Sequence, residues 1–433
     1  MIKRSIYKRL LNWKKDSKRK PLIVQGARQV GKTHIINEFG KSAYKNFIYL
    51  NFEQDVNLHP FFEGQLLPYK IIENLSIYFG KKIEATDTLI FFDEIQVLPE
   101  VITSLKYFNE QAPEFHIISA GSLLGVSVSA HKSFPVGKVN FLNMYPLSFM
   151  EYLTAIGEEL LVEKIRETIN FESLNEVFHQ QLIEHIKMYF FLGGMPEVVQ
   201  DYIDHKDIES VRKIQNEILE AYQRDFSKYN DKIQAIKCRE VWNSIPYQLA
   251  KENKKFKYSD VKSKARAATF ELTIEWLKNA GLVNVVKNIS TPKLPLSGYA
   301  NNSKFKLYLF DMGLLGAMLT IPSEIILNPS QLFTEYNGAF IENFVAQELV
   351  VYREQALFYW TSKSDAEVDY ILQLENEIFP LEVKSGLSRN LKSLRSYESK
   401  YVPKLIYRTS PRNFVQSDSF VNIPLYALVL FCK

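Results

Sequence analysis

Short apolar runs, each bounded by polar or turn-forming residues, recur through the first 150 residues of the chain. Such runs without alternation are typical of strands that are buried on both faces of a parallel sheet. A helical spacing of apolar residues, Ile35, Ile36 and Phe39, follows the first run. Strands that alternate with helices predict an α/β fold with a parallel sheet. The predicted strands occupy residues 21–25, 46–52, 88–94 and 115–122.

The pattern changes at about residue 147. Up to residue 234, charged and apolar residues are spaced by three and four positions, which predicts helices, and Gly193-Gly194 and Pro196 separate two of them. Residues 235–325 predict three helices and then two strands of a β-ribbon, which is the order of a winged helix-turn-helix. The helices are expected at 238–252, 258–263 and 267–281, and the strands at 282–286 and 304–310.

In a DNA-binding module the third helix would read the bases. Its expected face lacks the arginine or asparagine cluster that direct base readout needs, so sequence-independent DNA contact and pure scaffolding both stay open. This face consists of Thr269, Glu271, Thr273, Glu275 and Lys278.

The last hundred residues predict a second α/β region. A helix at 336–349 precedes a strand at 356–360. Two further apolar strands, each interrupted by charged residues, are predicted at 366–372 and 378–384.

The composition is that of a soluble globular protein. The chain has 433 residues, 46% hydrophobic and 24% charged, which excludes a disordered chain and suggests about three domains. Cys238 and Cys432 are too few for a disulfide framework, which fits a reducing compartment. No apolar run approaches the roughly 18 residues that span a bilayer, and the N-terminus lacks the apolar core of a signal peptide. We therefore expect a cytoplasmic protein without a transmembrane segment.

The net charge of +4 hides two local excesses. Residues 1–20 hold nine basic residues and one acid, and residues 251–266 hold seven basic residues and two acids. Basic segments suggest an anionic partner, which is nucleic acid, an acidic protein face or a membrane surface. Ile6, Leu10, Leu11 and Trp13 give the first segment an apolar face, which favours a helix packed beside the first domain over direct contact with nucleic acid.

The first strand leads into a motif with the spacing G-x-x-x-x-G-K-[ST]. Gly26 and Gly31 let the backbone curl so that its N–H groups face phosphate oxygens, and the following helix adds its positive dipole end. Lys32 is expected to reach the β- and γ-phosphates of ATP, and the Thr33 hydroxyl to ligate Mg²⁺. The predicted ATP-binding residues are Gly26, Ala27, Arg28, Gln29, Val30, Gly31, Lys32, Thr33 and His34.

Two acids, Asp93 and Glu94, end the third predicted strand. Ligands bind at the carboxyl ends of strands in open α/β sheets. We expect Asp93 to hold the Mg²⁺ through water and Glu94 to polarise the attacking water. Ser119 and Ser122, at the end of the fourth strand, are both candidates for contact with the γ-phosphate or the water, and a simple strand-to-turn junction is the alternative.

The chain resembles the bacterial and archaeal AAA+-like ATPases of the archaeal-ATPase group, related to the STAND NTPases, that carry a C-terminal domain of unknown function. The resemblance covers essentially the whole chain and implies a helical lid after the core. Lys138 stands where this family commonly has arginine. Arg224 is a candidate to reach a phosphate across the lid or from a neighbouring subunit, and the alternative is an ion pair with Glu220 or Asp225. The matching stretches are Val24–Thr33, Phe92–Gln96, Ala120–Ser122, Tyr145–Phe149 and Gly193–Glu197.

The C-terminal region carries a second chemical pattern. Asp369 and the Glu382-x-Lys384 pair are the elements of a PD-(D/E)xK nuclease arrangement, and Glu342 lies on the preceding helix. Carboxylates of Asp369 and Glu382 can ligate Mg²⁺, and Lys384 can orient the attacking water. The family resemblance also implies a restriction-endonuclease-like fold here. A salt-bridged strand pair without activity would look similar.

These observations predict a P-loop NTPase parallel sheet with a helical lid, then a winged helix-turn-helix, then an α/β restriction-endonuclease-like domain. The function expected is a Mg²⁺-dependent ATPase coupled to a DNA-binding or nuclease-like module, with sequence-independent DNA contact, a protein partner and oligomerisation left open. The alternatives are a nucleotide-dependent signalling or defence switch with a non-catalytic docking domain, and an ATPase recruited to a membrane surface. The predicted domains are 1–20, 21–146, 147–234, 235–325 and 326–433.

Overall fold

The computed structural model describes residues 2–121, 135, 137–168, 170–251, 253–324, 337–362, 366–386 and 390–432. The chain divides into two compact units. The N-terminal unit is Lys3–Tyr145 with Asn279–Gly281, and the C-terminal unit is Pro146–Lys278 and Leu282–Lys433, with Met1–Ile2.

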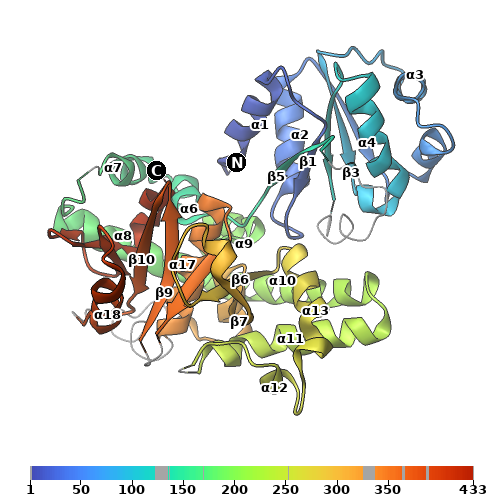
Figure 1. The fold of residues 1–433 in the computed structure, drawn as a ribbon. Helices are drawn as coiled ribbons and strands as arrows, with labels where there is room; N and C mark the ends of the chain where they lie inside the picture. The colour runs from blue at the N-terminus through green and yellow to red at the C-terminus, as the bar shows by residue number, and fades with distance from the viewer. Residues whose placement is uncertain are drawn as a thin grey trace. The chain divides into compact units, whose positions relative to one another are not determined.

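A five-stranded parallel sheet of order β2-β3-β4-β1-β5 forms the centre of the N-terminal unit (Figure 1). The four predicted strands are confirmed, whereas β5 was not predicted. Buried residues such as Leu50, Ile90 and Ile117 make the core of the sheet. The strands are β1 (Leu22–Gln25), β2 (Asn46–Asn51), β3 (Thr88–Asp93), β4 (His116–Ala120) and β5 (Asn140–Asn143).

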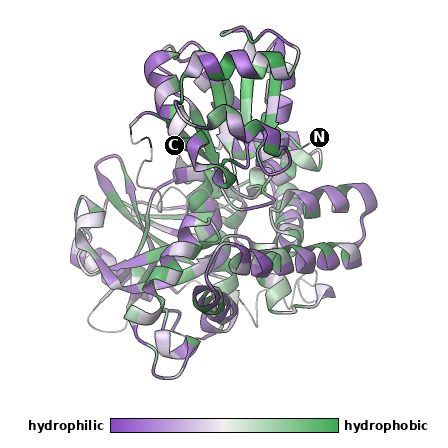
Figure 2. Cartoon of the chain, turned by 90° about the vertical axis from the view of Figure 1, so that its right-hand side faces the viewer, coloured by the Kyte–Doolittle hydropathy of each residue, from purple (hydrophilic) through white to green (hydrophobic). Residues whose placement is uncertain are grey.

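Helices flank this sheet, and Figure 2 shows the apolar strands in green between helices with polar outer faces. The helix predicted near the N-terminus is confirmed as α1, which contacts α2 and buries Leu10 and Trp13. The helices are α1 (Ile6–Lys15), α2 (Lys32–Ala43), α3 (Pro68–Tyr78) and α4 (Pro99–Gln111), with short 3-10 helices η1 (Val56–Phe62) and η2 (Ile95–Val97).

Residues 149–228 of the C-terminal unit are largely helical, as predicted. These helices contact elements of the same unit, including α14 (Met312–Met318) and η4 (Leu425–Cys432). Their role as a lid over a nucleotide stays a prediction. They are α6 (Phe149–Ala155), α7 (Glu159–Glu167), α8 (Glu176–Leu192), α9 (Pro196–His205) and α10 (Ile208–Lys228).

The predicted order of three helices and two strands is also found in the structure. The strands β6 (Val283–Ile289) and β7 (Ala300–Leu309) pair antiparallel, with the 3-10 helix η3 (Leu296–Tyr299) between them. The ribbon is not isolated, because β6 also pairs in parallel with β8 (Leu357–Thr361). The helices are α11 (Lys232–Leu249), α12 (Tyr258–Val261) and α13 (Ala267–Asn279).

The ribbon thereby joins an eight-stranded sheet of order β12-β13-β11-β10-β9-β8-β6-β7. The predicted boundary at residues 325/326 therefore falls between strands of a single sheet. Helix α17 (Asn337–Arg353) contacts β6, β7 and β10, and α18 (Lys392–Tyr401) contacts β9 and β10. The remaining strands are β9 (Glu367–Leu374), β10 (Glu377–Val383), β11 (Ile406–Ser410), β12 (Val415–Gln416) and β13 (Phe420–Pro424).

Among the described residues, none of the helices combines the length and the hydrophobicity needed to cross a bilayer.

Candidate functional site

The glycine-rich loop between β1 and α2 has the backbone that its sequence predicts. Gly26 and Gly31 have φ angles of 149° and 96°. Gly26 also lies against Met144, the residue after β5, because a Cβ at this position would be 2.0 Å from the carbonyl oxygen of Met144. Helix α2 begins at Lys32, directly after Gly31, so its free N–H groups and its positive dipole end adjoin the loop.

Lys32 is buried at the centre of this loop. Its Nζ donates hydrogen bonds to the carbonyl oxygens of Gly26 and Ala27, at 2.9 and 2.8 Å. Burial lowers the pKa of Lys32 to about 8, although the charges of Glu94 and Asp93 act in the opposite direction. The lysine is therefore held inside the loop, where a phosphate oxygen could replace either carbonyl as the acceptor.

The structure brings Thr33 and Asp93 together. The Thr33 hydroxyl donates to Asp93 Oδ2 at 2.9 Å, and the Tyr49 hydroxyl donates to the same oxygen at 3.0 Å. Burial, and then the charge of Glu94, raise the pKa of Asp93. A hydroxyl and a carboxylate are hard oxygen donors of the kind that Mg²⁺ prefers, so the pair fits this ion. The sequence analysis missed Tyr49.

Glu94 follows Asp93 in a left-handed conformation, with φ 54°, and immediately precedes η2. Its backbone N–H donates to Asp93 Oδ1 at 3.1 Å, and its side chain accepts a hydrogen bond from the amide of Gln96. The two acids thus share the carboxyl end of β3, as their position in the sequence predicts.

The other loop residues differ in exposure. Arg28, Gln29 and His34 are exposed, while Ala27 and Val30 are buried. Ala27 and Val30 can therefore contribute through their backbone groups and not through their side chains.

Of the two candidate serines, Ser119 is described and Ser122 lies outside the described residues. Ser119 is in register with Phe92 and is fully buried, and its hydroxyl has no hydrogen-bond partner among the described residues. Successive side chains of a strand point to opposite faces, so Ser119 is on the face of Phe92 and not on that of Asp93.

Arg4, which precedes α1, is a further residue at the loop that the sequence analysis missed. Its guanidinium donates to the carbonyl oxygens of Val30, at 3.1 Å, and Tyr145, at 2.6 Å. A planar guanidinium can hold two acceptors at once. The basic N-terminal segment therefore contacts the glycine-rich loop directly.

The two other basic residues considered from the sequence form surface ion pairs. Lys138 lies 3.0 Å from Glu110, and Arg224 lies 2.9 Å from Glu220, one of the two expected partners.

Four predicted residues of the C-terminal unit separate into two groups. Glu342 and Asp369 both face Lys306 of β7, whose Nζ lies 3.2 and 3.7 Å from their carboxylates. Burial raises the pKa of Glu342, but the charges of Lys254 and Lys306 outweigh it and lower this pKa to about 2. Burial and then the charge of Glu342 raise the pKa of Asp369 to about 7.

Glu382 and Lys384 pair with each other at 2.8 Å. The backbone connects the groups, because the N–H of Val383 donates to Asp369 Oδ2 at 2.8 Å. Over the described part of the chain, no three acidic, histidine or cysteine side chains are placed to hold a metal ion together. The acids predicted to bind Mg²⁺ thus have lysines as their neighbours, and the sequence analysis missed Lys306.

Helix α13, the predicted reading helix, presents a mixed surface. Thr269, Glu271, Glu275 and Lys278 are exposed, as expected, whereas Thr273 is buried and accepts a hydrogen bond from the Gln234 side chain at 3.1 Å. The expected face is therefore incomplete.

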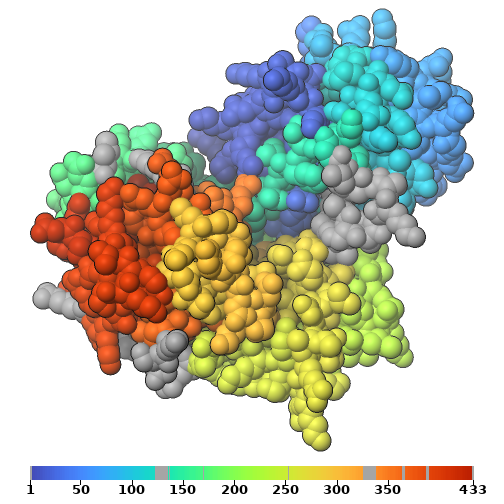
Figure 3. Space-filling model, in the orientation of Figure 1, coloured from blue at the N-terminus to red at the C-terminus, as the bar shows by residue number. Residues whose placement is uncertain are grey.

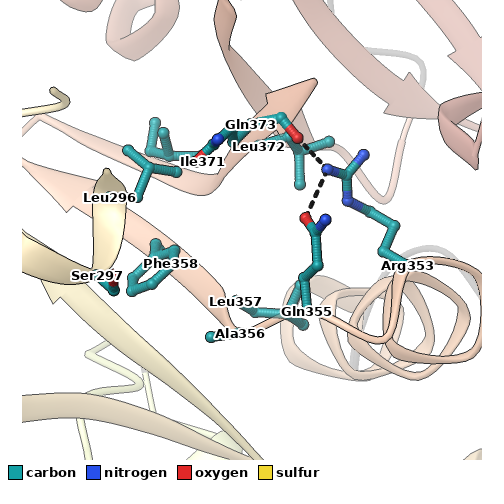
Figure 4. A pocket seen from close by; sticks show the side chains of 10 residues that line it. All are labelled: Leu296, Ser297, Arg353, Gln355, Ala356, Leu357, Phe358, Ile371, Leu372 and Gln373. Carbon is teal, nitrogen blue, oxygen red and sulfur yellow. Dashed lines mark hydrogen bonds between the residues drawn. The ribbon is translucent and has the colours of Figure 1, made fainter. Parts of the chain in front are cut away.

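A pocket of about 220 Å³ beside β8 and β9 contains none of the predicted residues (Figure 4). Apolar side chains such as Leu296 and Phe358 line much of it. The guanidinium of Arg353 at its side donates to the Gln355 side chain and to the carbonyl oxygen of Gln373, so it braces the surrounding backbone.

A strand, a glycine-rich loop, a helix that begins with Lys32-Thr33 and an acidic strand end beside Thr33 define a P-loop nucleotide-binding domain. Residues 18–153 match a family model described as an AAA domain. Residues 18–153 therefore form an AAA-type P-loop ATPase domain.

Two further family models match the rest of the chain. Residues 183–325 match a domain of unknown function, DUF8612, and residues 337–428 match another, DUF4143. No curated protein matches the chain in sequence.

Solved structures with overall similarity include the Walker-type ATPase PABY2304 of Pyrococcus abyssi, at 13% identity and a TM-score of 0.46, covering 74% of this chain and 96% of that one. The ORC1 protein of Aeropyrum pernix in complex with DNA is 11% identical with a TM-score of 0.27, and the match covers 73% of this chain and 91% of that one. Cdc6p from Pyrobaculum aerophilum is 10% identical with a TM-score of 0.24, and the match covers 74% of this chain and 92% of that one. These similarities are weak, and the classification depends on the match at residues 18–153.

Proposed function

We propose that this chain hydrolyses ATP with Mg²⁺ at the loop of residues 26–34. The observation that carries the proposal is the contact between the Thr33 hydroxyl and the Asp93 carboxylate, which places two hard oxygen donors beside Lys32. Thr33 and Asp93 would hold the ion, directly or through water. When bound, Mg²⁺ neutralises charge on the phosphate oxygens.

Lys32 and Glu94 have separate tasks in this proposal. Lys32 exchanges its carbonyl acceptors at Gly26 and Ala27 for phosphate oxygens and so binds and orients ATP. Glu94 polarises the attacking water, and its amide partner Gln96 restrains the carboxylate. Because both acids lie at the end of β3, the metal-binding and water-activating groups are adjacent.

The test is ATP binding and turnover by three variants. Lys32→Ala should lose binding, and Glu94→Gln should keep binding but lose most of its turnover, since in this proposal Lys32 binds the ground-state phosphates whereas Glu94 acts on the attacking water. Lys70→Ala removes the same charge from an exposed site on α3 and should behave like the wild type. Full ATPase activity of Lys32→Ala would overturn the assignment.

We propose further that the C-terminal unit contains a winged helix and a restriction-endonuclease-like sheet, and that this unit contacts DNA without sequence preference. The succession of helix α17 and strands β8, β9 and β10 supports the second fold. The exposed basic residues Lys257, Lys264 and Arg266 support the DNA contact. Part of this basic segment, around α12, is visible in yellow at the surface in Figure 3.

DNA contact predicts that duplex DNA stimulates ATP turnover and that binding weakens steeply with salt. Lys264→Ala with Arg266→Ala should reduce the salt dependence, whereas Lys404→Ala, at an exposed ion pair with Glu377, should not. Turnover that is unaffected by DNA, together with no DNA binding at low salt, would remove this part of the proposal.

A nucleotide-dependent switch that docks a protein partner is the second candidate. It is favoured by three lysines of the basic segment that already have acidic partners: Lys251 with Asp260, Lys254 with Glu342 and Lys262 with Glu240. Slow turnover with tight retention of nucleotide would favour the switch. A reducing, cytoplasmic location belongs to either candidate and is supported by Cys238, a buried free thiol.

A further inference from the structure

Three carboxylates of the C-terminal unit surround one ammonium group. Lys306 is fully buried, and its Nζ lies 2.6 Å from the carboxylate of Glu367, 3.2 Å from that of Glu342 and 3.7 Å from that of Asp369. An ammonium has three N–H donors and no acceptor. Glu367 and Glu342 lie within hydrogen-bond distance of this lysine, and Asp369 lies just beyond it as a third ion-pair partner. The acids come from α17 and β9, while the lysine comes from β7.

Glu342 is enclosed further. Lys254 forms a second ion pair with it, and the Tyr308 hydroxyl donates to its Oε2 at 2.7 Å. A buried carboxylate is strongly destabilised unless it is paired and hydrogen-bonded. The two lysines and the tyrosine supply what Glu342 requires.

We propose that Lys306 is the resident cation of this cluster and takes the place of the divalent metal that a nuclease-like centre would need. The proposal goes beyond ATP hydrolysis and does not rest on it. Mg²⁺ requires a nearly octahedral shell of oxygens at about 2.0–2.1 Å. The ammonium of Lys306 already pairs with the carboxylates of Glu342 and Glu367 and lies 3.7 Å from that of Asp369, and its charge repels a second cation from the same position.

The source of the lysine strengthens this inference. Lys306 lies on the ribbon that the sequence assigns to a winged helix, and not on the Glu382-x-Lys384 strand. Meanwhile Lys384 is paired with Glu382. Because β7 belongs to the larger sheet, it supplies the carboxylate cluster with its own cation. The C-terminal unit therefore does not cleave phosphodiesters by a metal-dependent route.

The test uses Mn²⁺ as the probe and isothermal titration calorimetry of the full chain without nucleotide. All proteins carry Asp93→Asn, which removes the carboxylate proposed to hold metal at the P-loop. With Lys306 present, no Mn²⁺ should bind. Lys306→Ala, or Lys306→Gln, which keeps most of the side-chain length, should bind one Mn²⁺ with an affinity at least tenfold above the detection limit of the titration, and adding Asp369→Asn should abolish this binding.

Lys404→Ala removes the same charge from the surface of the same unit and is the matched control, which should bind no Mn²⁺. Two results would overturn the proposal: Mn²⁺ binding by the protein with Lys306 intact that disappears in Asp369→Asn, or folded Lys306 variants that gain none. Because the assay contains no ATP, failure of the ATPase assignment would appear separately, in the turnover of the Lys32 variant.

Discussion

Replacing Gly26 by alanine tests whether the glycine-rich loop depends on its close contact with Met144, the residue after β5. At φ 149°, Gly26 has a backbone conformation that other residues rarely adopt, and its Cβ would lie 2.0 Å from the carbonyl oxygen of Met144. The strained conformation costs roughly 1–3 kcal/mol. Overpacking a tightly packed site costs typically about 1–3 kcal/mol more.

Together these effects lower the free energy of unfolding by roughly 4 kcal/mol, which corresponds to a fall in melting temperature on the order of 10 °C for a unit of this size. Calorimetry measures the melting temperature, and a fluorescent ATP analogue measures affinity. Affinity should fall at least tenfold, because the loop N–H groups can no longer keep their positions.

Gly64→Ala is the matched control. Gly64 also has a positive φ, 69°, but no atom lies within 4 Å of its Cβ position, so only the backbone cost of about 1–2 kcal/mol applies. If Gly26→Ala melted within about 2 °C of Gly64→Ala and bound nucleotide like the wild type, the reasoning about Met144 would be refuted.

Two further predictions concern other buried contacts. Arg4→Met should weaken nucleotide binding severalfold, because the Val30 carbonyl of the loop loses a charged donor. The control is Lys8→Met, at an exposed site on α1, which should bind nucleotide like the wild type. Fluorescence titration compares the affinities of the two variants. Glu348→Gln should make the C-terminal unit more stable than the wild type at pH 8 and similar to it at pH 4, as measured by denaturant unfolding. Burial raises the pKa of Glu348 from 4.5 to about 8, and an amide oxygen can still accept the Phe149 N–H.

The sign of the second effect follows from proton binding. Folded Glu348 keeps its proton up to about pH 8, whereas the unfolded side chain loses it near pH 4.5. The folded state of the wild type therefore becomes less stable as pH rises between these values, by up to roughly 5 kcal/mol. If the free energy of unfolding of the wild type and of Glu348→Gln changed with pH in parallel, the raised pKa of Glu348 would not be the cause. If Arg4→Lys bound nucleotide as tightly as the wild type, the guanidinium's ability to donate to two carbonyl oxygens at once would not matter for binding, and this reasoning about Arg4 would be wrong.

Local sequence signals predicted the strand, the glycine-rich loop and the helix start of the P-loop. Residues 26–33 are consecutive, and their glycines and the helix start at Lys32 fix the loop by short-range backbone preferences. The acids at the end of β3 were predicted because a parallel sheet places strand ends together. Strand β5 was missed, since it has four residues and begins and ends with asparagine.

Contacts between residues far apart in the sequence required the tertiary structure. Lys306 reaches Glu367, and Arg4 reaches Tyr145, across 61 and 141 residues. No periodicity of apolar residues records which buried charge will face which, because this depends on the strand order that brings β7 and β9 into one sheet. The sequence alone thus determined a P-loop ATPase core and the elements of the C-terminal unit. Only the fold decided that the nuclease-like acids face a lysine, since burying charge in a low-dielectric interior requires a counter-charge close by.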